Sequence, residues 1–256
     1  MKAGTRAGLF TLLALVAISL VSAVALTWPV TLTIDTAVMV DDEIPLADLL
    51  LPTWMSWYYS SRLPDLLLKP SLFFRTDLLN YPAGYDLWHN VPHQFLSIPE
   101  ALLTYVCGYP AGISLFQILT LAANMACMAW VVYLLTGRVF LGAVLGILYG
   151  ASPIFLREVM ALRTEQTIGF CAPLAAYCLV VYRRDRSKRS QWLLGAALAL
   201  TAVTYVFYGL FCLVLVGLAL VFDLVNRRKQ TAAVIREYGR IIAAFILLSL
   251  PFTLPY

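Results

Sequence analysis

The stretch "AGLFTLLALVAISLVSAVALTWPV", residues 7–30, decides the fold class, because it contains no charged residue from end to end. About 20 apolar residues are enough to cross a bilayer as a helix. The stretch follows Lys2 and Arg6, as the apolar core of a secretory signal would. It is too long for such a core, so we interpret it as a retained first span.

Uncharged runs of the same kind recur along the chain. Of its 256 residues, 61% are hydrophobic and only 12% are charged, whereas a soluble domain carries about 25% charged residues. Lipid offers no hydrogen-bond partner to an open backbone, so these runs predict helices. We therefore predict an all-α integral membrane protein in which residues 1–256 form a single transmembrane module. The further runs are 101–137, 139–156, 166–182, 190–222 and 241–256.

Two of these runs are too long for one crossing. The sequence "CGYPAG" interrupts the first, so the second span should begin near Gly112, and 95–106 should form a short half-helix or surface segment. The run 190–222 lies between two basic segments, and if both are cytoplasmic it must turn back as a hairpin near 205–209. We predict about seven spans, with a first span at 7–30, an outer loop at 31–111 and six spans within 112–256.

The placement of charge predicts a cytoplasmic N-terminus. This orientation puts most of the 18 basic residues inside, as the positive-inside rule requires. Because the basic residues gather in short loops beside spans, the net charge of +4 does not indicate a nucleic-acid partner. The predicted inside residues are Lys2, Arg6, Arg138, Arg183, Arg184, Arg186, Lys188, Arg189, Arg227, Arg228, Lys229, Arg236 and Arg240.

The long outer loop is the part of the chain that is richest in acids and aromatics. Trp54, Trp57 and two tyrosines lie close together within 46–62, which predicts an amphipathic helix lying on the outer membrane surface. Asp48 falls on its first turn, where the helix dipole favours a carboxylate. That accounts for one acid alone, and a long loop held on the membrane is commonly functional.

The stretch "RTDLLNYPAGYDLWHN", residues 75–90, is rich in charges, amides and aromatics, and its part "NYPAGYDLWHN", residues 80–90, predicts a non-regular loop over the outer mouth of the bundle. Pro82 fixes one backbone angle, and Gly84 permits a turn that other residues resist. His89 and His93 have the spacing of a metal pair, but Pro92 lies between them and no third ligand is evident, which favours loop hydrogen bonding over zinc. The substrate-binding candidates here are Arg75, Asn80, Asp86, His89, Asn90 and His93.

A second polar cluster, "REVMALRTEQ" at 157–166, follows the third span on the same predicted side. Charged residues at such a place usually have a partner or a ligand. Arg163 and Glu165 are substrate-binding candidates, with Arg163 as a phosphate clamp. The alternative for Arg163 is an ion pair with Glu158 or Glu165.

Small residues in the spans predict packing. Gly142, Gly146 and Gly150 repeat every four residues and give one smooth helix face, which indicates close helix packing rather than a nucleotide loop. Four of the five cysteines lie inside apolar runs and no CxxC pair occurs, so we interpret them as small core residues.

The order of motifs resembles that of bacterial multi-spanning proteins of the glycosyltransferase C superfamily. A first span is followed by a surface helix with an acid before a W-x-x-W pair, a "T..L.YP.G" stretch, a Pro–Glu half-helix and "GYPAG" before the second span. The resemblance continues through "YLLTGRVFLGAVLGILYGASPIFL" and covers nearly the whole chain. The matching residues are Asp48, Trp54, Trp57, Thr76, Tyr81, Pro82, Gly84, Pro99 and Gly108.

The resemblance implies a multi-pass protein of the bacterial inner membrane. It would transfer a sugar from a polyprenyl-phosphate donor to a glycan, lipid or protein acceptor on the outer face. The family keeps its catalytic acid in the first outer loop, where Asp48 matches best, followed by Asp41, Asp42 and Asp35. The acids of "DDE" suit a divalent cation, although a solvated acidic turn is an equal explanation for Glu43.

Alternatives to a transferase stay open. Members of the resembled family are usually longer, so we expect either a truncated N-terminal module or a pared-down protein. A non-catalytic scaffold subunit, a lipid-linked glycan carrier or flippase, and an unrelated transporter are the other classes. A transporter more often carries charges in mid-span, whereas Asp223 sits at a cytoplasmic end, which favours chemistry or binding at the outer surface over a path through the bilayer.

Overall fold

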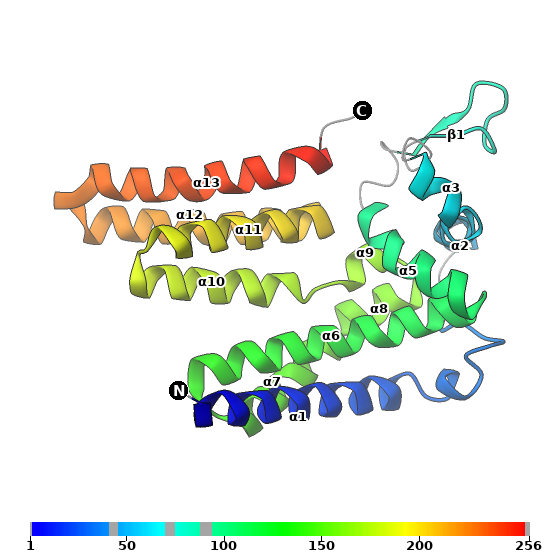
Figure 1. The fold of residues 1–256 in the computed structure, drawn as a ribbon, viewed down its shortest axis with the longest axis horizontal. Helices are drawn as coiled ribbons and strands as arrows, with labels where there is room; N and C mark the ends of the chain where they lie inside the picture. Colours follow the sequence, from blue (N-terminus) through cyan, green and yellow to red (C-terminus); the bar gives the residue numbers. More distant parts are fainter. Residues whose placement is uncertain (1, 41–45, 70–74, 88–93, 254–256) are drawn as a thin grey trace. The chain divides into compact units, whose positions relative to one another are not determined.

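The computed structural model describes residues 2–40, 46–69, 75–87 and 94–253. They are mainly α-helical, as predicted, and they group into two compact units, Met1–Ile168 and Gly169–Tyr256 (Figure 1). The first unit contains α1 (Lys2–Leu26), η1 (Val30–Leu32), α2 (Leu46–Ser61), α3 (Leu63–Leu68), β1 (Arg75–Thr76), β2 (Tyr85–Asp86), α5 (Gln94–Cys107), α6 (Ala111–Thr136), α7 (Val139–Gly150), α8 (Pro153–Met160) and α9 (Thr164–Thr167). The second contains α10 (Cys171–Asp185), α11 (Lys188–Thr204), α12 (Val206–Asn226), η3 (Arg228–Gln230) and α13 (Thr231–Thr253).

Three helices of the first unit, α1, α6 and α7, lie side by side (Figure 1). The glycine face of α7 packs on α6, which confirms the predicted close packing. A Cβ added to Gly146 would stand 2.5 Å from the carbonyl oxygen of Met125 and 2.7 Å from the Cβ of Ala129. The two backbones can approach this closely only because glycine has no side chain.

Several helices are suited to crossing a membrane, which supports a membrane protein. Gly8–Leu26, Ala111–Thr136 and Val206–Asn226 are long and apolar enough, and α7 with α8 would make a fourth span. The α7–α8 pair bends by 45° at a short break. Pro153 begins α8, and because proline disfavours helical backbone in the residue before it, the break falls at Ser152.

The segment predicted as an outer loop, 31–111, contains a layer of short elements, which we call the surface layer: α2, α3, the β1–β2 hairpin and α5. Helix α2 covers Leu46–Ser61, which confirms the helix predicted at 46–62. Helix α5 covers the predicted half-helix, and α6 begins at Ala111, beside the predicted Gly112. A Cβ on Gly112 would collide with the backbone of Thr104, so this glycine lets α5 pack against the start of α6.

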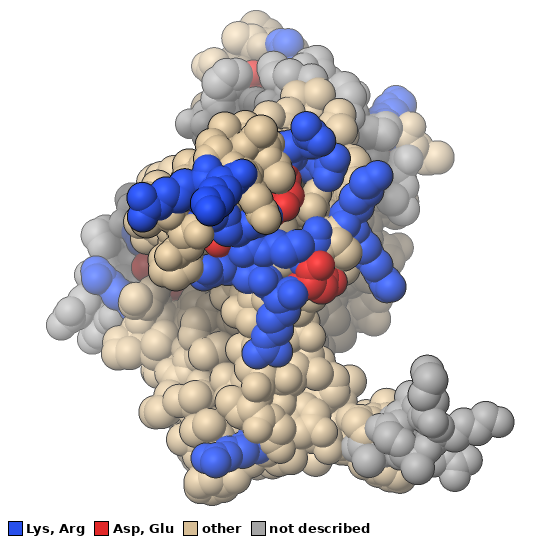
Figure 2. Space-filling model, turned by 90° about the vertical axis from the view of Figure 1, so that its left-hand side faces the viewer, with Lys and Arg blue, Asp and Glu red and all other residues tan. Residues whose placement is uncertain are grey.

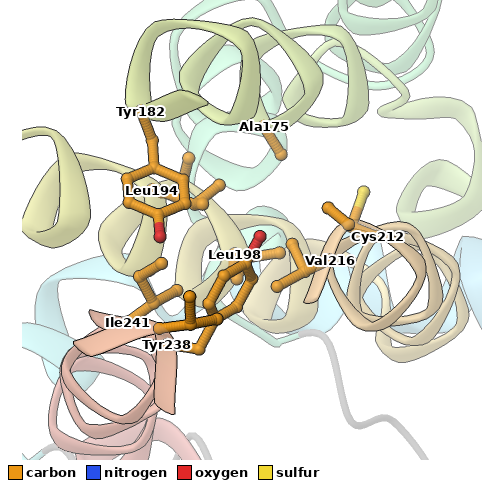
Figure 3. Packing of buried hydrophobic residues seen from close by; sticks show 11 residues of the cluster. Ala175, Tyr182, Leu194, Leu198, Cys212, Val216, Tyr238 and Ile241 are labelled. Atoms are coloured by element: carbon orange, nitrogen blue, oxygen red, sulfur yellow. The ribbon is translucent and has the colours of Figure 1, made fainter. Parts of the chain in front are cut away.

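The second unit contains four successive α-helices, of which α10, α12 and α13 pack against α11 (Figure 1). Helices α11 and α12 are separated by the single residue Tyr205, which confirms a break at the predicted hairpin turn. Figure 3 shows Tyr182, Leu194, Leu198 and Ile241 gathered in the core of this unit. All four side chains are fully buried.

Two helix starts in the second unit differ from the apolar runs. Helix α10 begins at Cys171 rather than near 166, and Pro173 occupies its first turn, where proline is tolerated. Helix α13 begins at Thr231, ten residues before the apolar run. Its charged first part is helical because Val234, Tyr238 and Ile241 recur at helical spacing and are buried.

Candidate functional site

The surface layer has its own small core of aromatic and apolar side chains. Met55, Tyr58 and Tyr59 of α2 lie on one helix face and are buried, and they pack with Leu87 and Ala101. The ring of Trp54 stacks on Tyr58, with centroids 5.0 Å apart, and Trp57, on another face of α2, is 49% exposed. This packing fixes α2 against α5 and positions its first turn, where Asp48 is located.

The structure describes the four candidate acids to different extents. Asp48 is the third residue of α2, although its side chain lies outside the described residues. Asp41 and Asp42 also lie outside the described residues. Asp35 follows η1 and is exposed, so its carboxylate is open to solvent.

The stretch 75–86 is a hairpin with a two-residue ladder at its base, rather than an entirely non-regular loop. Arg75 pairs with Asp86 and Thr76 with Tyr85 in antiparallel register. The Arg75 guanidinium donates to the carbonyl oxygen of Ala83 at 2.8 Å, and thus braces the turn of its own hairpin. The backbone of Gly84 has a φ of +74°, which confirms that the turn uses the freedom of glycine.

The remaining candidates of this stretch are exposed or undescribed. Asn80 has a φ of +57° and its side-chain amide lies 3.4 Å from the carbonyl oxygen of Gly84. The side chains of Asn80 and Asp86 are both exposed. His89, Asn90 and His93 lie outside the described residues.

The second polar cluster occupies α8, α9 and the turn between them. Arg163 Nη1 lies 3.4 Å from Glu158 Oε2, so the structure contains the ion pair that was the alternative to a phosphate clamp. The Arg163 side chain is 38% exposed. Glu165 belongs to α9, and its side chain lies outside the described residues.

One side chain of α6 joins the outer loop to the second polar cluster. The Gln117 amide nitrogen donates to the carbonyl oxygen of Val159 at 2.7 Å and lies 3.5 Å from that of Met39. A glutamine amide has two N–H donors, so one hydrogen is available for each carbonyl. Ser114 donates to the carbonyl oxygen of Ala37 at 2.8 Å. The backbone that leads to Asp41 and Asp42 and the backbone that leads to Arg163 therefore meet at α6.

Sequence reasoning missed these polar residues of α6. Asn124 completes the set by donating to the carbonyl oxygen of Thr167 at 2.6 Å. Ser114, Gln117 and Asn124 recur on one face of α6 and are buried. The signal was present in the sequence, because amides inside an apolar span usually have a specific partner, but only charged residues were sought there.

A buried carboxylate was also missed. Glu100 in α5 is 5% exposed, whereas the sequence analysis treated it only as part of a half-helix. Burial of an acid is costly unless other groups compensate its charge. Among the residues that the structure describes, no group of three or more His, Cys, Asp or Glu side chains is arranged to hold a metal ion.

Comparison with known proteins adds no relative. No family model, no curated protein and no solved structure matches the chain.

Proposed function

We propose that this chain is a membrane glycosyltransferase of the glycosyltransferase C type. It transfers a sugar from a polyprenyl-phosphate donor to an acceptor on the outer face of a bacterial inner membrane. Its seven spans are α1, α6, α7 with α8, α10, α11, α12 and the part of α13 from Ile241 onward, with the N-terminus in the cytoplasm. The motif order that resembles this superfamily motivates the proposal, and it spans both units.

The observation that carries the proposal is the junction at Gln117. Sugar transfer from a lipid phosphate needs a carboxylate that takes the proton of the acceptor and a cationic group that holds the departing phosphate. The Gln117 amide contacts the carbonyl oxygen of Met39, just before the segment that bears the acids, and that of Val159, just before the turn that bears Arg163. In the proposed mechanism Asp48 is the general base, and Arg163 binds the departing phosphate.

The proposal is tested with the full chain in lipid nanodiscs. The donor probe is undecaprenyl phosphate carrying a radiolabelled hexose, and the readout is labelled sugar moved from the lipid to an added acceptor extract. Asp48→Asn keeps the shape of the side chain and removes its basicity, so turnover should fall by about 100-fold or more. Asp65→Asn replaces an exposed acid of α3 in the same layer; it is the matched control and should keep full activity.

The other outcomes would assign the general base to another acid or reject the proposed mechanism. If Asp48→Asn is fully active, the base is Asp41, Asp42 or Asp35, and each is then replaced in the same way. If all four variants transfer sugar like the unmodified chain, the proposed acid mechanism is wrong. If the unmodified chain transfers none from any lipid-linked hexose yet still binds the donor, a scaffold or carrier role replaces the transferase.

A further inference from the structure

Basic side chains gather at one end of the second unit, where both of its basic turns lie. The α10–α11 turn and the α12–α13 turn are joined there, because Arg186 bonds Asp223 and Tyr182 donates to Glu237 at 2.9 Å. Figure 2 shows a surface dominated by Lys and Arg, with few acids among them. The basic residues of this end are Arg183, Arg184, Arg186, Lys188, Arg189, Arg227, Arg228, Lys229, Arg236 and Arg240.

Two of the acids at this end are already neutralised by internal partners. Arg186 binds both oxygens of Asp223, with Nη2 to Oδ1 at 3.0 Å. Arg227 binds both oxygens of Glu237, at 2.8 and 3.1 Å. The hydrogen bond with Arg227 holds the pKa of Glu237 below its usual range, so this pair stays ionised at neutral pH. The remaining cations therefore face solvent with an excess of positive charge.

Part of this positive charge lines an open hollow at the α12–α13 turn. It has a volume of about 490 Å³ and is lined by Asn226, Arg227, Arg228, Lys229 and Gln230. Arg227 is committed to Glu237 and Gln230. Arg228 and Lys229 are exposed and form no ion pair with any carboxylate in the part of the chain that the structure describes. Their positive charge is available to a ligand.

An exposed apolar face of α12 ends next to the residues that line this hollow. Phe211, Val214, Leu218, Val221 and Val225 are spaced by three and four residues, and each is more than half exposed. Val225 is the residue before Asn226, which begins the lining of the hollow. An apolar helix face about four turns long thus ends at a cationic hollow.

We propose that this hollow and the apolar face of α12 bind an anionic phospholipid. The lipid phosphate lies in the hollow against Arg228 and Lys229, and the acyl chains lie along α12. The charge of the hollow selects an anion, and the adjoining apolar face selects an anion with hydrocarbon chains over a nucleic acid or an acidic peptide. This inference does not depend on the transferase proposal.

The test measures lipid binding to the full chain in detergent micelles by native mass spectrometry. Phosphatidylglycerol is titrated against phosphatidylcholine with the same acyl chains. Because each basic residue contributes about a fivefold preference for anionic lipid, Arg228→Gln with Lys229→Gln should weaken phosphatidylglycerol binding about 30-fold and leave phosphatidylcholine unchanged. The matched control, Arg184→Gln with Arg189→Gln, removes the same charge from the other turn and should change binding less than threefold.

Competition arms distinguish the ligand classes. Inorganic phosphate at millimolar concentration and a single-stranded DNA oligonucleotide should both fail to displace phosphatidylglycerol. Complete displacement by phosphate would show that the apolar face takes no part, and displacement by the oligonucleotide would indicate a nucleic-acid surface; either result overturns the proposal. Equal weakening in the control variant would also overturn it, because diffuse charge would then explain the binding. Each single substitution should weaken binding about fivefold, and unchanged phosphatidylcholine binding shows that the double variant is folded.

Discussion

Replacement of Gln117 by leucine should release the second polar cluster from α6 without unfolding the protein. Leucine has a similar size but cannot donate a hydrogen bond. Gln117 is 3% exposed, so water cannot take its place. Loss of the 2.7 Å bond leaves the carbonyl oxygen of Val159 with only its backbone hydrogen bond from Leu162, so the expected cost is that of one hydrogen bond, about 0.5–1.5 kcal/mol. The contact with Met39 is at the limit of a hydrogen bond, so we assign it no additional cost.

Hydrogen–deuterium exchange of the full chain measures this effect. A cost of about 0.5–1.5 kcal/mol should accelerate exchange of amides that open with this segment about 2- to 12-fold. The reporters are the amides of Ala161, Leu162 and Arg163, which are bonded within the α8–α9 turn. Gln191→Leu is the matched control, since Gln191 is an equally buried glutamine that donates to the carbonyl oxygen of Arg186 in the other unit. Unchanged exchange at 161–163 in Gln117→Leu, or the same rise in both variants, would refute the reasoning.

Three further predictions concern packing, topology and pH. Gly146→Val should lower stability by about 1–3 kcal/mol because its side chain would collide with the backbone of α6; the melting temperature should fall, whereas Gly217→Val, where a Cβ meets nothing within 4 Å, should change it little. A cysteine at Ser187, in a background without native cysteines, should react with an impermeant thiol reagent only after the cells are opened, and labelling of intact cells would reverse the proposed topology. The ion pair with Arg227 lowers the pKa of Glu237, which lies in α13 before the predicted span 241–256. The ion pair should stabilise the fold fully at a pH above the usual glutamate pKa of about 4.3, and this stabilisation should disappear as the pH falls below that value and through the lowered pKa of the folded state. The difference in melting temperature between the unmodified chain and Glu237→Gln should therefore shrink at acidic pH, and a constant difference would contradict this assignment.

The sequence predicted a helix correctly where the length of an uncharged run and the charges that flank it determine its position. The apolar runs predicted α1 and α6, the "CGYPAG" interruption predicted the start of α6 to within a residue, and the two flanking basic segments predicted the break at Tyr205. These features depend on local hydrophobicity and on breaker residues, so a single sequence contains them. The start of α13 was missed because its first turns are charged outside and buried only along one narrow face.

Side-chain partners in the site did not follow from the sequence. The bond from Gln117 to Val159 links residues 42 positions apart, and Arg163 had two acids within reach along the chain. Which partner is used depends on how α8 folds back on α6. Periodicity contains no such information. The paired strands of the hairpin were also missed, because each has only two residues and alternation cannot be recognised over so short a length.

The amides of α6 also limit where this protein tolerates insertions and deletions. Gln117 and Asn124 are seven residues apart, or about two helical turns and 10.5 Å, and each holds a fixed carbonyl on the opposing segment. One residue inserted between them would rotate Asn124 by about 100° and turn its amide away from Thr167. The protein should therefore not tolerate insertions or deletions within 118–123. The C-terminal end of α6 should tolerate a change in length, because it ends in a left-handed cap at Gly137, where an added Cβ would meet no atom within 4 Å. In the first unit, the spacing along one helix thus fixes the alignment of three chain segments.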